Sequence, residues 1–489
     1  MKIKTPEACG FSSAAIEKFI RVLEENHLFT HNLLLAKGDD VFFEHYWAPF
    51  DKDFLHRLYS VSKSFVSIAV GFAEQDGLIS LDDPISHYFP DEAACATNKL
   101  LAEQTVRHML MMSTTVEQEN WFYKRHPDRV RLYFENPITD RRPDGTIFNY
   151  DSTGSFVLSA MVEKVTGMPF MEYLRQKLFS KIGVSEGATC LLCPGGYSWG
   201  DSACLTTARD LFLVARFLLN GGKWNGEQLL NEEYVKAAVS KQIDNNVDCI
   251  FNYDTFGYGY LIWRTYDDSW FFNGMGCQFA IAVPHKDLIM VYNGDNQGNR
   301  YAAKVIIDHF FELIVRGKQD LSDPIAAANS LSDYTKDLRL GCAWGSAHSV
   351  FADLISGKTF RLEPNRMNIR YVKLILNGDE GVLEYENATG VKTLPFGMCK
   401  NVFGEFPEEG YSDMVGSQYA PGRFYKCAAS AAWVEEKKLF LHVQVIDTYF
   451  GKLNIALGFR DENTLGIQMT KTAEDFFDTY QGFAEGYAE

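Results

Sequence analysis

The start of the chain follows a helical pattern of apolar positions and then a strand pattern. Apolar residues recur at i, i+3, i+4 and i+7 after Ser12 and Ser13, which predicts a capped helix. β-Rich runs at 32–36 and 41–47, joined by a Lys-Gly-Asp-Asp turn, predict a hairpin. Residues 60–75 are apolar on nearly every side, which predicts a buried helix.

Helical signals dominate the middle of the chain, and strand signals return after it. The pattern predicts helices at 155–166, 170–179 and 207–219. It then predicts strands at 257–264, 270–272, 278–283 and 287–292, and a helix at 301–316. Short-turned strands at both ends of this region indicate one antiparallel sheet closed by the terminal helices, with a helical lobe inserted between its halves. A ligand cleft is expected between the sheet and the lobe.

The last third of the chain changes to a period of two. Residues 317–335 resemble a linker, after which apolar residues alternate with mostly polar neighbours at 439–445, 453–459 and 465–469. This alternation predicts an antiparallel sandwich or barrel. We therefore expect an α+β domain over residues 1–320 and a C-terminal all-β domain over residues 335–489.

Composition and charge exclude several classes of protein. Hydrophobic residues make up 46% and charged residues 23% of the 489 positions, as in ordinary folded proteins. The 47 basic and 64 acidic residues give a formal charge of −17. Because this field repels phosphate backbones and anionic lipids, we expect neither nucleic acid nor a membrane as a partner. The N-terminus lacks the apolar stretch of a secretory signal, so a cytoplasmic location is expected.

The ten cysteines do not form a recognisable framework. They are scattered, as expected where thiols stay reduced, and Cys190 and Cys193 form the one C-x-x-C. A four-ligand zinc site would need a second close pair, and the chain contains no H-E-x-x-H sequence. We expect no metal, and the cysteines are interpreted as small core side chains.

Ser60 and Lys63 form the single S-x-x-K sequence of the chain. Three residues are close to one helical turn, so the lysine ammonium lies within reach of the serine hydroxyl. In an apolar helix the lysine is partly desolvated, which favours its neutral, proton-accepting form. A serine hydroxyl needs such a partner to act as a nucleophile. A serine that caps the helix, with a lysine at the surface, is the alternative interpretation.

The segment LYSVSKSF around Ser60 and the segment FNYDSTGSFVLSAMVEKVTG at 148–167 resemble the serine β-lactamase and penicillin-binding superfamily. The resemblance covers roughly residues 5–316 and is closest to class C β-lactamases and related esterases. It implies a β-lactamase/transpeptidase-like fold, with an antiparallel sheet flanked by helices and a helical lobe. It also implies that Ser60 is the acyl-accepting nucleophile and Lys63 its general-base partner.

The same resemblance assigns roles to two residues of the second segment. Tyr150 would be the proton shuttle, and Ser152 would be a hydrogen-bonding partner of Lys63. A phenol beside an ammonium ionises more easily than an isolated phenol, so it can relay a proton to the leaving group. The alternative is a core tyrosine, followed by Asp151 or Ser152 as the cap of the next helix.

A third segment, WFFNGMGCQFAIAVP, matches the superfamily's strand beside the active site but departs from it at one position. Phe272 replaces the usual Lys or His of the triplet that Asn273 and Gly274 complete. That cation normally receives a substrate carboxylate, so hydrolysis of penicillins is in doubt. The backbone N–H of Met275 can still join that of Ser60 in an oxyanion hole.

Other residues are candidates for the site or its walls. The sequence around Ser198 fits the G-x-S-x-G nucleophile elbow, but the strand, helix and downstream histidine that an elbow requires are not indicated. Trp199 and Tyr197 are expected to line the cleft instead. Gln118 and Trp121 are expected in another cleft wall, and an ordinary structural loop is the alternative there.

The sequence favours a serine hydrolase that cleaves an ester or amide of a small molecule through an acyl-enzyme on Ser60. No cofactor is required, and a homo-oligomer is compatible with the sequence. One alternative is a β-lactamase or a D-aminopeptidase or D-peptidase. Another is a non-hydrolytic, penicillin-binding-like protein that senses acyl groups. Residues 336–489 provide no candidate site.

Overall fold

The computed structural model divides into two compact units, and the boundary along the chain lies between Arg339 and Leu340. It describes residues 2–115, 121, 126–135, 141–246, 251–409, 422–472 and 475–489. The sequence pattern placed the end of the first domain at residue 320 and the start of the second at residue 335. The difference comes from a helix that packs onto the first unit.

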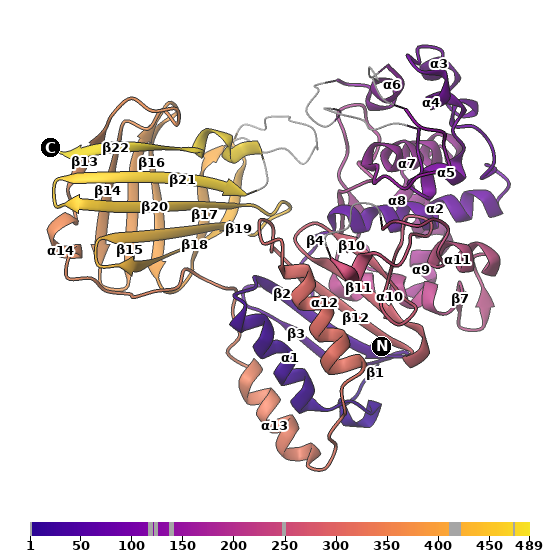
Figure 1. The fold of residues 1–489 in the computed structure, drawn as a ribbon, viewed down its shortest axis with the longest axis horizontal. Coiled ribbons are helices and arrows are strands. Elements are labelled where there is room, and N and C mark those ends of the chain that lie inside the picture. The colour runs from indigo at the N-terminus through magenta and orange to yellow at the C-terminus, as the bar shows by residue number, and fades with distance from the viewer. Residues whose placement is uncertain are drawn as a thin grey trace. The chain divides into compact units, whose positions relative to one another are not determined.

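The first unit is built on one seven-stranded sheet with strands from both ends of the unit (Figure 1). Its strands, in spatial order, are β1 (Lys2–Ile3), β3 (Asp40–Tyr46), β2 (Thr30–Lys37), β12 (Leu288–Gly294), β11 (Gln278–Val283), β10 (Ser269–Gly274) and β9 (Trp263–Thr265). All neighbours are antiparallel except β1 and β3. The predicted single antiparallel sheet is confirmed.

One predicted strand of this sheet is mostly wrong. The run at 257–264 alternates well, but the strand begins only at Trp263. Gly257 and Leu261 have φ angles of 106° and 56°. Because extended strands require negative φ, these left-handed residues interrupt the strand.

Helices cover one face of the sheet with the main apolar core. They are α1 (Ser13–Glu25), α12 (Ala302–His309) with the π-turn η7 (Phe310–Val315), and α13 (Pro324–Thr335). The predicted linker at 317–335 is therefore wrong over α13. Asp323 caps this helix through the backbone N–H of Ala326, and Leu331 is buried in the core. Arg21 of α1 covers the Tyr334 ring at 3.9 Å.

The opposite face carries the helical lobe, inserted between β3 and β9. Its main helices are α2 (Ser62–Gln75), α7 (Ser152–Thr166), α8 (Phe170–Leu174) with the π-turn η4 (Arg175–Phe179), and α10 (Ala208–Leu219). The shorter ones are α3 (Pro90–Ala93), α4 (Lys99–Glu103), α5 (Val106–Leu110), α6 (Arg129–Glu135), α9 (Ser180–Ile182) and α11 (Glu232–Val239). Two small sheets complete it: β4 (His56–Arg57), β6 (Cys204–Thr206) and β5 (Thr189–Cys190), and the pair β7 (Lys223–Trp224) and β8 (Glu227–Gln228).

Packing in the lobe follows the apolar pattern of its helices. Helix α2 packs against α7 and α8, and it is buried on all sides, as predicted. Helix α10 packs on β11 and β12 and begins with a capping box between Thr207 and Asp210. The predicted helices at 60–75, 155–166, 170–179 and 207–219 are all helical.

The second unit is a closed sheet with the short helix α14 (Ala352–Ile355), and its strands are antiparallel except where β16 pairs with β18 in parallel. In spatial order its described strands are β16 (Gly390–Met398), β15 (Glu380–Asn387), β14 (Tyr371–Asn377), β13 (Thr359–Leu362), β22 (Gly482–Ala488), β21 (Thr464–Thr472), β20 (Lys452–Asp461), β19 (Lys438–Val445), β18 (Phe424–Glu435) and β17 (Val402–Glu409). Pairing of β16 with β18 closes the barrel. The alternating apolar residues at 439–445, 453–459 and 465–469 are all buried, so the predicted all-β fold is confirmed.

Candidate active site

Ser60 lies where the chain turns from the small sheet of the lobe into the buried helix α2. The backbone N–H of Leu58 donates to the Cys204 carbonyl at 2.8 Å, and the Cys204 N–H donates to the Ser62 hydroxyl at 3.0 Å. Tyr59 between them has a φ of 47°, an unusual conformation for this residue type. These contacts fix both sides of Ser60, which is half-buried.

Lys63 contacts Ser60 directly. Its ammonium donates to the Ser60 hydroxyl oxygen at 2.9 Å and to the backbone carbonyl of Asp201 at 2.8 Å. The lysine side chain is only 1% exposed. The alternative of a surface lysine is therefore wrong, because the motif spacing brings the amine to the hydroxyl inside the protein.

Tyr150 joins this pair from a distant segment. The Lys63 ammonium lies 5.0 Å from the centroid of the Tyr150 ring, and the ring stacks on Trp263 at 5.7 Å. The tyrosine side chain is 37% exposed, so it is not a core residue. The structure thus brings together the three residues that the resemblance assigned to proton transfer.

Asp151 and Ser152 follow Tyr150 at the start of α7. Asp151 caps the helix, accepting hydrogen bonds from the N–H groups of Thr153 and Gly154, and burial raises the pKa of its carboxyl. Ser152 is the first residue of the helix and is half-buried. Within the described residues, the hydrogen bond that Lys63 was expected to make with Ser152 goes instead to the Asp201 carbonyl.

The end of β10 passes very close to the segment before Ser60. A Cβ atom on Gly274 would lie 2.2 Å from the Leu58 carbonyl oxygen, so glycine is required there. Met275, just after the strand, is 50% exposed, and Asn273 is half-buried. The close approach brings the end of β10 next to the segment that carries Ser60.

The turn after β10 is held by a buried amide that sequence reasoning missed. The Gln278 side chain donates to the carbonyls of Met275 at 3.2 Å and Gly294 at 2.5 Å. It accepts a hydrogen bond from Asn293 at 2.9 Å, and Asn293 accepts one from Asn32 at 3.0 Å. These side chains come from β2, β11 and β12, so nothing local in the sequence indicates the connection.

Phe272 occupies the position where the superfamily has a cation. Its ring is 0% exposed and lies 5.5 Å from that of Trp270, two residues earlier on β10. Phe271 between them belongs to the core cluster on the other face of the sheet. The side of β10 that bears Phe272 is therefore apolar.

The G-x-S-x-G sequence is structural rather than an elbow. Ser198 is buried, its backbone N–H donates to the Glu163 carboxylate at 3.2 Å, and it forms a bridge with Leu192 instead of ending a parallel strand. Burial raises the pKa of Glu163. A catalytic role for Ser198 does not fit this environment.

Trp199 does not line a cleft. Its indole is 2% exposed and packs against Trp121 at 5.5 Å and Phe156 at 5.7 Å, with the Arg129 guanidinium 5.2 Å from the ring. The prediction of a cleft wall is wrong because these neighbours enclose the ring. Trp121 is likewise buried, and Gln118 lies outside the described residues.

Asp201 is a second residue that sequence reasoning missed. Its carboxylate oxygen Oδ2 lies 3.9 Å from the Lys63 nitrogen, and both side chains are buried. Burial raises the Asp201 pKa to about 6, and the charges of Lys63 and Arg57 partly oppose that effect. A carboxylate that titrates near neutrality next to a candidate base is a recognised feature of active sites.

The described part of the chain holds neither a candidate metal site nor a disulfide. It contains no group of three or more His, Cys, Asp and Glu side chains that could hold a metal ion. The nine cysteines in it are free thiols. None of its helices has both the length and the apolar character that crossing a bilayer requires.

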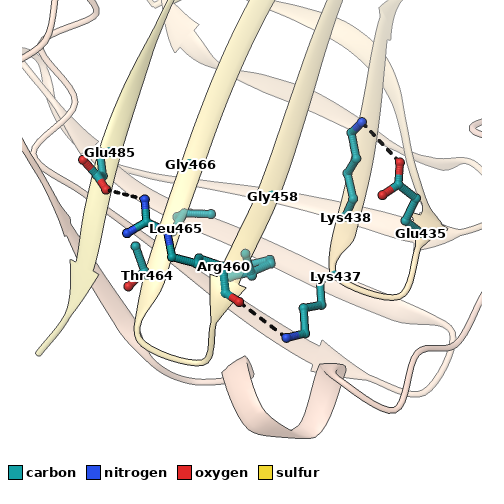
Figure 2. A pocket seen from close by; sticks show the side chains of 10 residues that line it. Glu435, Lys437, Lys438, Gly458, Arg460, Thr464, Leu465, Gly466 and Glu485 are labelled. Atoms are coloured by element: carbon teal, nitrogen blue, oxygen red, sulfur yellow. Dashed lines mark hydrogen bonds and ion pairs between the residues drawn. The ribbon is translucent and has the colours of Figure 1, made fainter.

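The barrel has a pocket of its own, of about 540 Å³, at the hairpin ends of β18–β19 and β20–β21 (Figure 2). Its charged side chains have partners within the pocket itself. Arg460 lies 3.5 Å from Glu485, Lys438 lies 3.6 Å from Glu435, and Lys437 donates to the Arg460 carbonyl. These pairs account for the polar character of the pocket without a ligand.

Comparisons with known proteins address the first unit. The family model described as Beta-lactamase matches residues 16–308. A 6-aminohexanoate-dimer hydrolase of Paenarthrobacter ureafaciens is 28% identical over 226 residues, which are 43% of this chain and 57% of that protein. A penicillin-binding protein of Bacillus subtilis is 21% identical over 35% of this chain and 40% of its own length. The chain thus spans less than two thirds of these relatives.

A solved structure matches both units. The octameric penicillin-binding protein homologue from Pyrococcus abyssi has a TM-score of 0.50 and 14% identity, covering 96% of this chain and 99% of that one. At this identity the match concerns the fold alone. Because the family model covers more than half of the chain, this protein belongs to the Beta-lactamase family, with the β-lactamase/transpeptidase-like fold.

Proposed function

We propose that this protein is a serine hydrolase that cleaves an ester or amide bond of a small molecule through an acyl-enzyme on Ser60. The observation that carries the proposal is the 2.9 Å contact between the Nζ atom of the buried Lys63 and the Ser60 hydroxyl oxygen. Nucleophilic catalysis by serine requires a base held at this distance, and the neutral amine of Lys63 is such a base. Tyr150, beside the lysine, completes the group that handles the proton.

In this mechanism the Ser60 oxygen attacks the substrate carbonyl while its proton passes to the Lys63–Tyr150 pair. The backbone N–H groups of Ser60 and Met275 stabilise the tetrahedral oxyanion. The pair then returns the proton to the departing alcohol or amine. Water hydrolyses the acyl-enzyme and restores Ser60. The chemistry requires neither a metal nor an organic cofactor.

The substrate is proposed to lack a carboxylate near the reacting carbonyl. Phe272, with its apolar surroundings, stands where a cation would attract such a group. The name of the relative from Paenarthrobacter ureafaciens, 6-aminohexanoate-dimer hydrolase, supports an amide as one class of scissile bond. A matched pair of p-nitrophenyl esters, one neutral and one ending in a carboxylate, would test the charge preference. A higher kcat/KM for the carboxylate ester would contradict it.

The nucleophile is tested by intact-mass analysis after reaction with a fluorophosphonate probe. We expect one adduct on the wild type and on Ser198→Ala, and none on Ser60→Ala. Ser198 is the matched control because it lies in the other motif of the chain that suggests a catalytic serine. Labelling that survives Ser60→Ala but disappears in Ser198→Ala would overturn the proposal.

Turnover assays separate the alternatives. A β-lactamase or D-peptidase would turn over nitrocefin faster than p-nitrophenyl esters, whereas we expect the reverse. An acyl-sensing protein would form a stable Ser60 adduct and show no multiple turnover on any ester or amide.

Several properties of the whole protein stay proposals of the same kind. Self-association is proposed because the homologue from Pyrococcus abyssi is described as octameric, and light scattering after gel filtration would measure it. The absence of nucleic-acid and membrane partners is proposed from the formal charge of −17. The cytoplasmic location expected from the sequence also stays a proposal.

A further inference from the structure

We propose that Asp201 is a positioning residue of the Ser60 site. In this proposal its buried carboxylate is the counter-ion that holds Lys63 and stabilises the positive charge that the Lys63–Tyr150 pair gains when Ser60 attacks. The inference rests on the proposed function and adds a third group to the serine and its base.

The geometry makes Asp201 contact Lys63 twice. The backbone carbonyl accepts a hydrogen bond from the ammonium at 2.8 Å, and the carboxylate oxygen Oδ2 lies 3.9 Å from the same nitrogen. Both side chains are at most 2% exposed. The same nitrogen also donates to the Ser60 hydroxyl, so the end of the lysine is held between the nucleophile and the carboxylate.

The loop that carries Asp201 is fixed on both sides. A Cβ atom on Gly200 would lie 2.4 Å from the Ser159 side chain of α7, so the loop lies tightly against that helix. On the other side, Arg57 donates from its Nε to the Ser202 carbonyl at 3.1 Å. The position of the carboxylate is therefore set by backbone packing rather than by its own flexibility.

Charge balance gives the carboxylate its role. Before the attack the pair carries no net charge, as a neutral amine beside a phenol. When the Ser60 oxygen forms a bond to the substrate carbonyl carbon, the hydroxyl proton moves to the Lys63–Tyr150 pair, whose net charge rises from zero to +1. When the substrate C–O or C–N bond breaks, the pair gives this proton to the leaving group, and its charge falls again. A buried carboxylate close to the lysine stabilises the charged state between these events.

The Asp201 carboxylate is paired with Lys63 but only partly hydrogen-bonded. Its second oxygen, Oδ1, is buried and accepts no hydrogen bond from the described residues. An uncharged residue of the same shape would leave the protonated form of the buried Lys63 without a counter-charge, so the negative charge of Asp201 serves the lysine. Enzymes with a serine nucleophile often place a third group next to the base to orient it, and Asp201 has this position relative to Lys63.

Asp201 is the group expected to respond to moderate acid. The charged or titratable groups that act on it are Lys63 of α2, Arg57 of β4, Arg129 of α6 and the Cys190 thiol of β5. Burial lowers the pKa of Arg129 to about 10 and raises that of the Cys190 thiol, so both keep their charge state around neutral pH. The pKa of Asp201 is raised to about 6, so its counter-charge is present above that pH and is lost below it.

The test compares the pH dependence of kcat/KM for a p-nitrophenyl ester in the wild type and in Asp201→Asn. Asparagine keeps the shape and the backbone carbonyl but removes the charge. We expect the wild-type kcat/KM to rise with pH through about 6 and the variant to lose that limb. At neutral pH we expect the variant to be about 100-fold slower, as is typical when one group of a proton-transfer system is removed.

Asp210→Asn is the matched control. Asp210 is also a buried aspartate of the lobe, but it caps α10 and accepts hydrogen bonds from the N–H groups of Thr207 and Ser185. We expect this variant to lose stability while keeping the wild-type pH profile.

The outcomes distinguish the inference from the function on which it rests. If Ser60→Ala is inactive and unlabelled but Asp201→Asn keeps the wild-type rate and acid limb, the function stands and the role of Asp201 is refuted. If Ser60→Ala stays active, the function itself is wrong. Should Asp201→Asn fail to fold, the wild-type profile decides alone, because the absence of an acid limb near pH 6 overturns the proposal.

Discussion

Gly274→Ala tests the close approach between β10 and the nucleophile segment. The new Cβ atom would lie 2.2 Å from the Leu58 carbonyl oxygen, 3.0 Å from the Gln278 Cβ and 3.2 Å from a Val61 methyl group. Carbon–oxygen contacts normally lie at about 3.3 Å or more, so β10 and the Leu58 backbone must separate by about 1 Å. Gly274 does not have a positive φ, so the backbone conformation itself accepts alanine.

This displacement has two expected consequences. Overpacking of a tight contact destabilises by about 1–3 kcal/mol, which urea unfolding measures. A shift of about 1 Å between the strand that carries the Met275 N–H and the Ser60 hydroxyl should lower kcat/KM by about 100-fold. Steady-state kinetics on a p-nitrophenyl ester measures this loss, under conditions in which the variant is fully folded.

Gly187→Ala is the control in the same unit. The added Cβ atom would lie 3.6 Å from its nearest neighbour, Leu55, which is an ordinary contact. We expect wild-type activity and stability for this variant. A Gly274→Ala protein that folds and keeps the wild-type kcat/KM would refute the argument that this contact sets the geometry of the site.

Three further substitutions test individual contacts. Gln278→Leu leaves the Met275 carbonyl without its amide donor, and we expect about a tenfold loss of kcat/KM in ester hydrolysis, the equivalent of one hydrogen bond. Asp151→Ala removes the cap of α7, and we expect about 1 kcal/mol less stability in urea unfolding. Tyr480→Phe removes the hydroxyl that donates to Glu408 at 2.8 Å inside the barrel, and we expect a loss of about 1–3 kcal/mol in the unfolding of that unit. Unchanged values would contradict each assignment.

The fold was largely predictable because its elements have strong periodic patterns. The buried helix α2 and the alternating strands of the barrel place apolar residues at the positions their geometry requires. Helix α13 was missed because most of its surface is exposed and polar or small. It is stabilised by contacts that the local pattern does not contain, such as Arg21 of α1 on Tyr334.

The site was predictable where the chemistry is local. Ser60 and Lys63 lie on one turn of helix, so their contact follows from spacing alone. Asp201 reaches the same lysine from a position 138 residues further along the chain, in a loop that lacks a regular pattern. Such a contact depends on how the lobe folds back on α2, and no signal near Asp201 in the sequence indicates it.

Trp199 shows the opposite error, in which residue type was given too much weight. Aromatic side chains are common in binding clefts, but they are also the largest contributors to cores. Here Trp121, Phe156 and the Arg129 guanidinium surround the indole. A tryptophan beside a glycine-rich turn therefore does not by itself predict a binding site, because the side chains around it decide whether it is exposed.

The charges around Ser60 connect two features of the site, the apolar Phe272 in place of a cation and the buried carboxylate of Asp201. Lys63, Arg57 and Arg129 are the cations that act on the Asp201 carboxylate, and Phe272 adds none from β10. If position 272 carried a cation, it would bind a substrate carboxylate, and that negative charge would be in the site only while the substrate is bound. The Asp201 carboxylate instead stabilises the positive charge that forms on the Lys63–Tyr150 pair, and it belongs to the protein itself. A substrate then needs no carboxylate of its own for this step, which agrees with the proposed preference for neutral esters and amides.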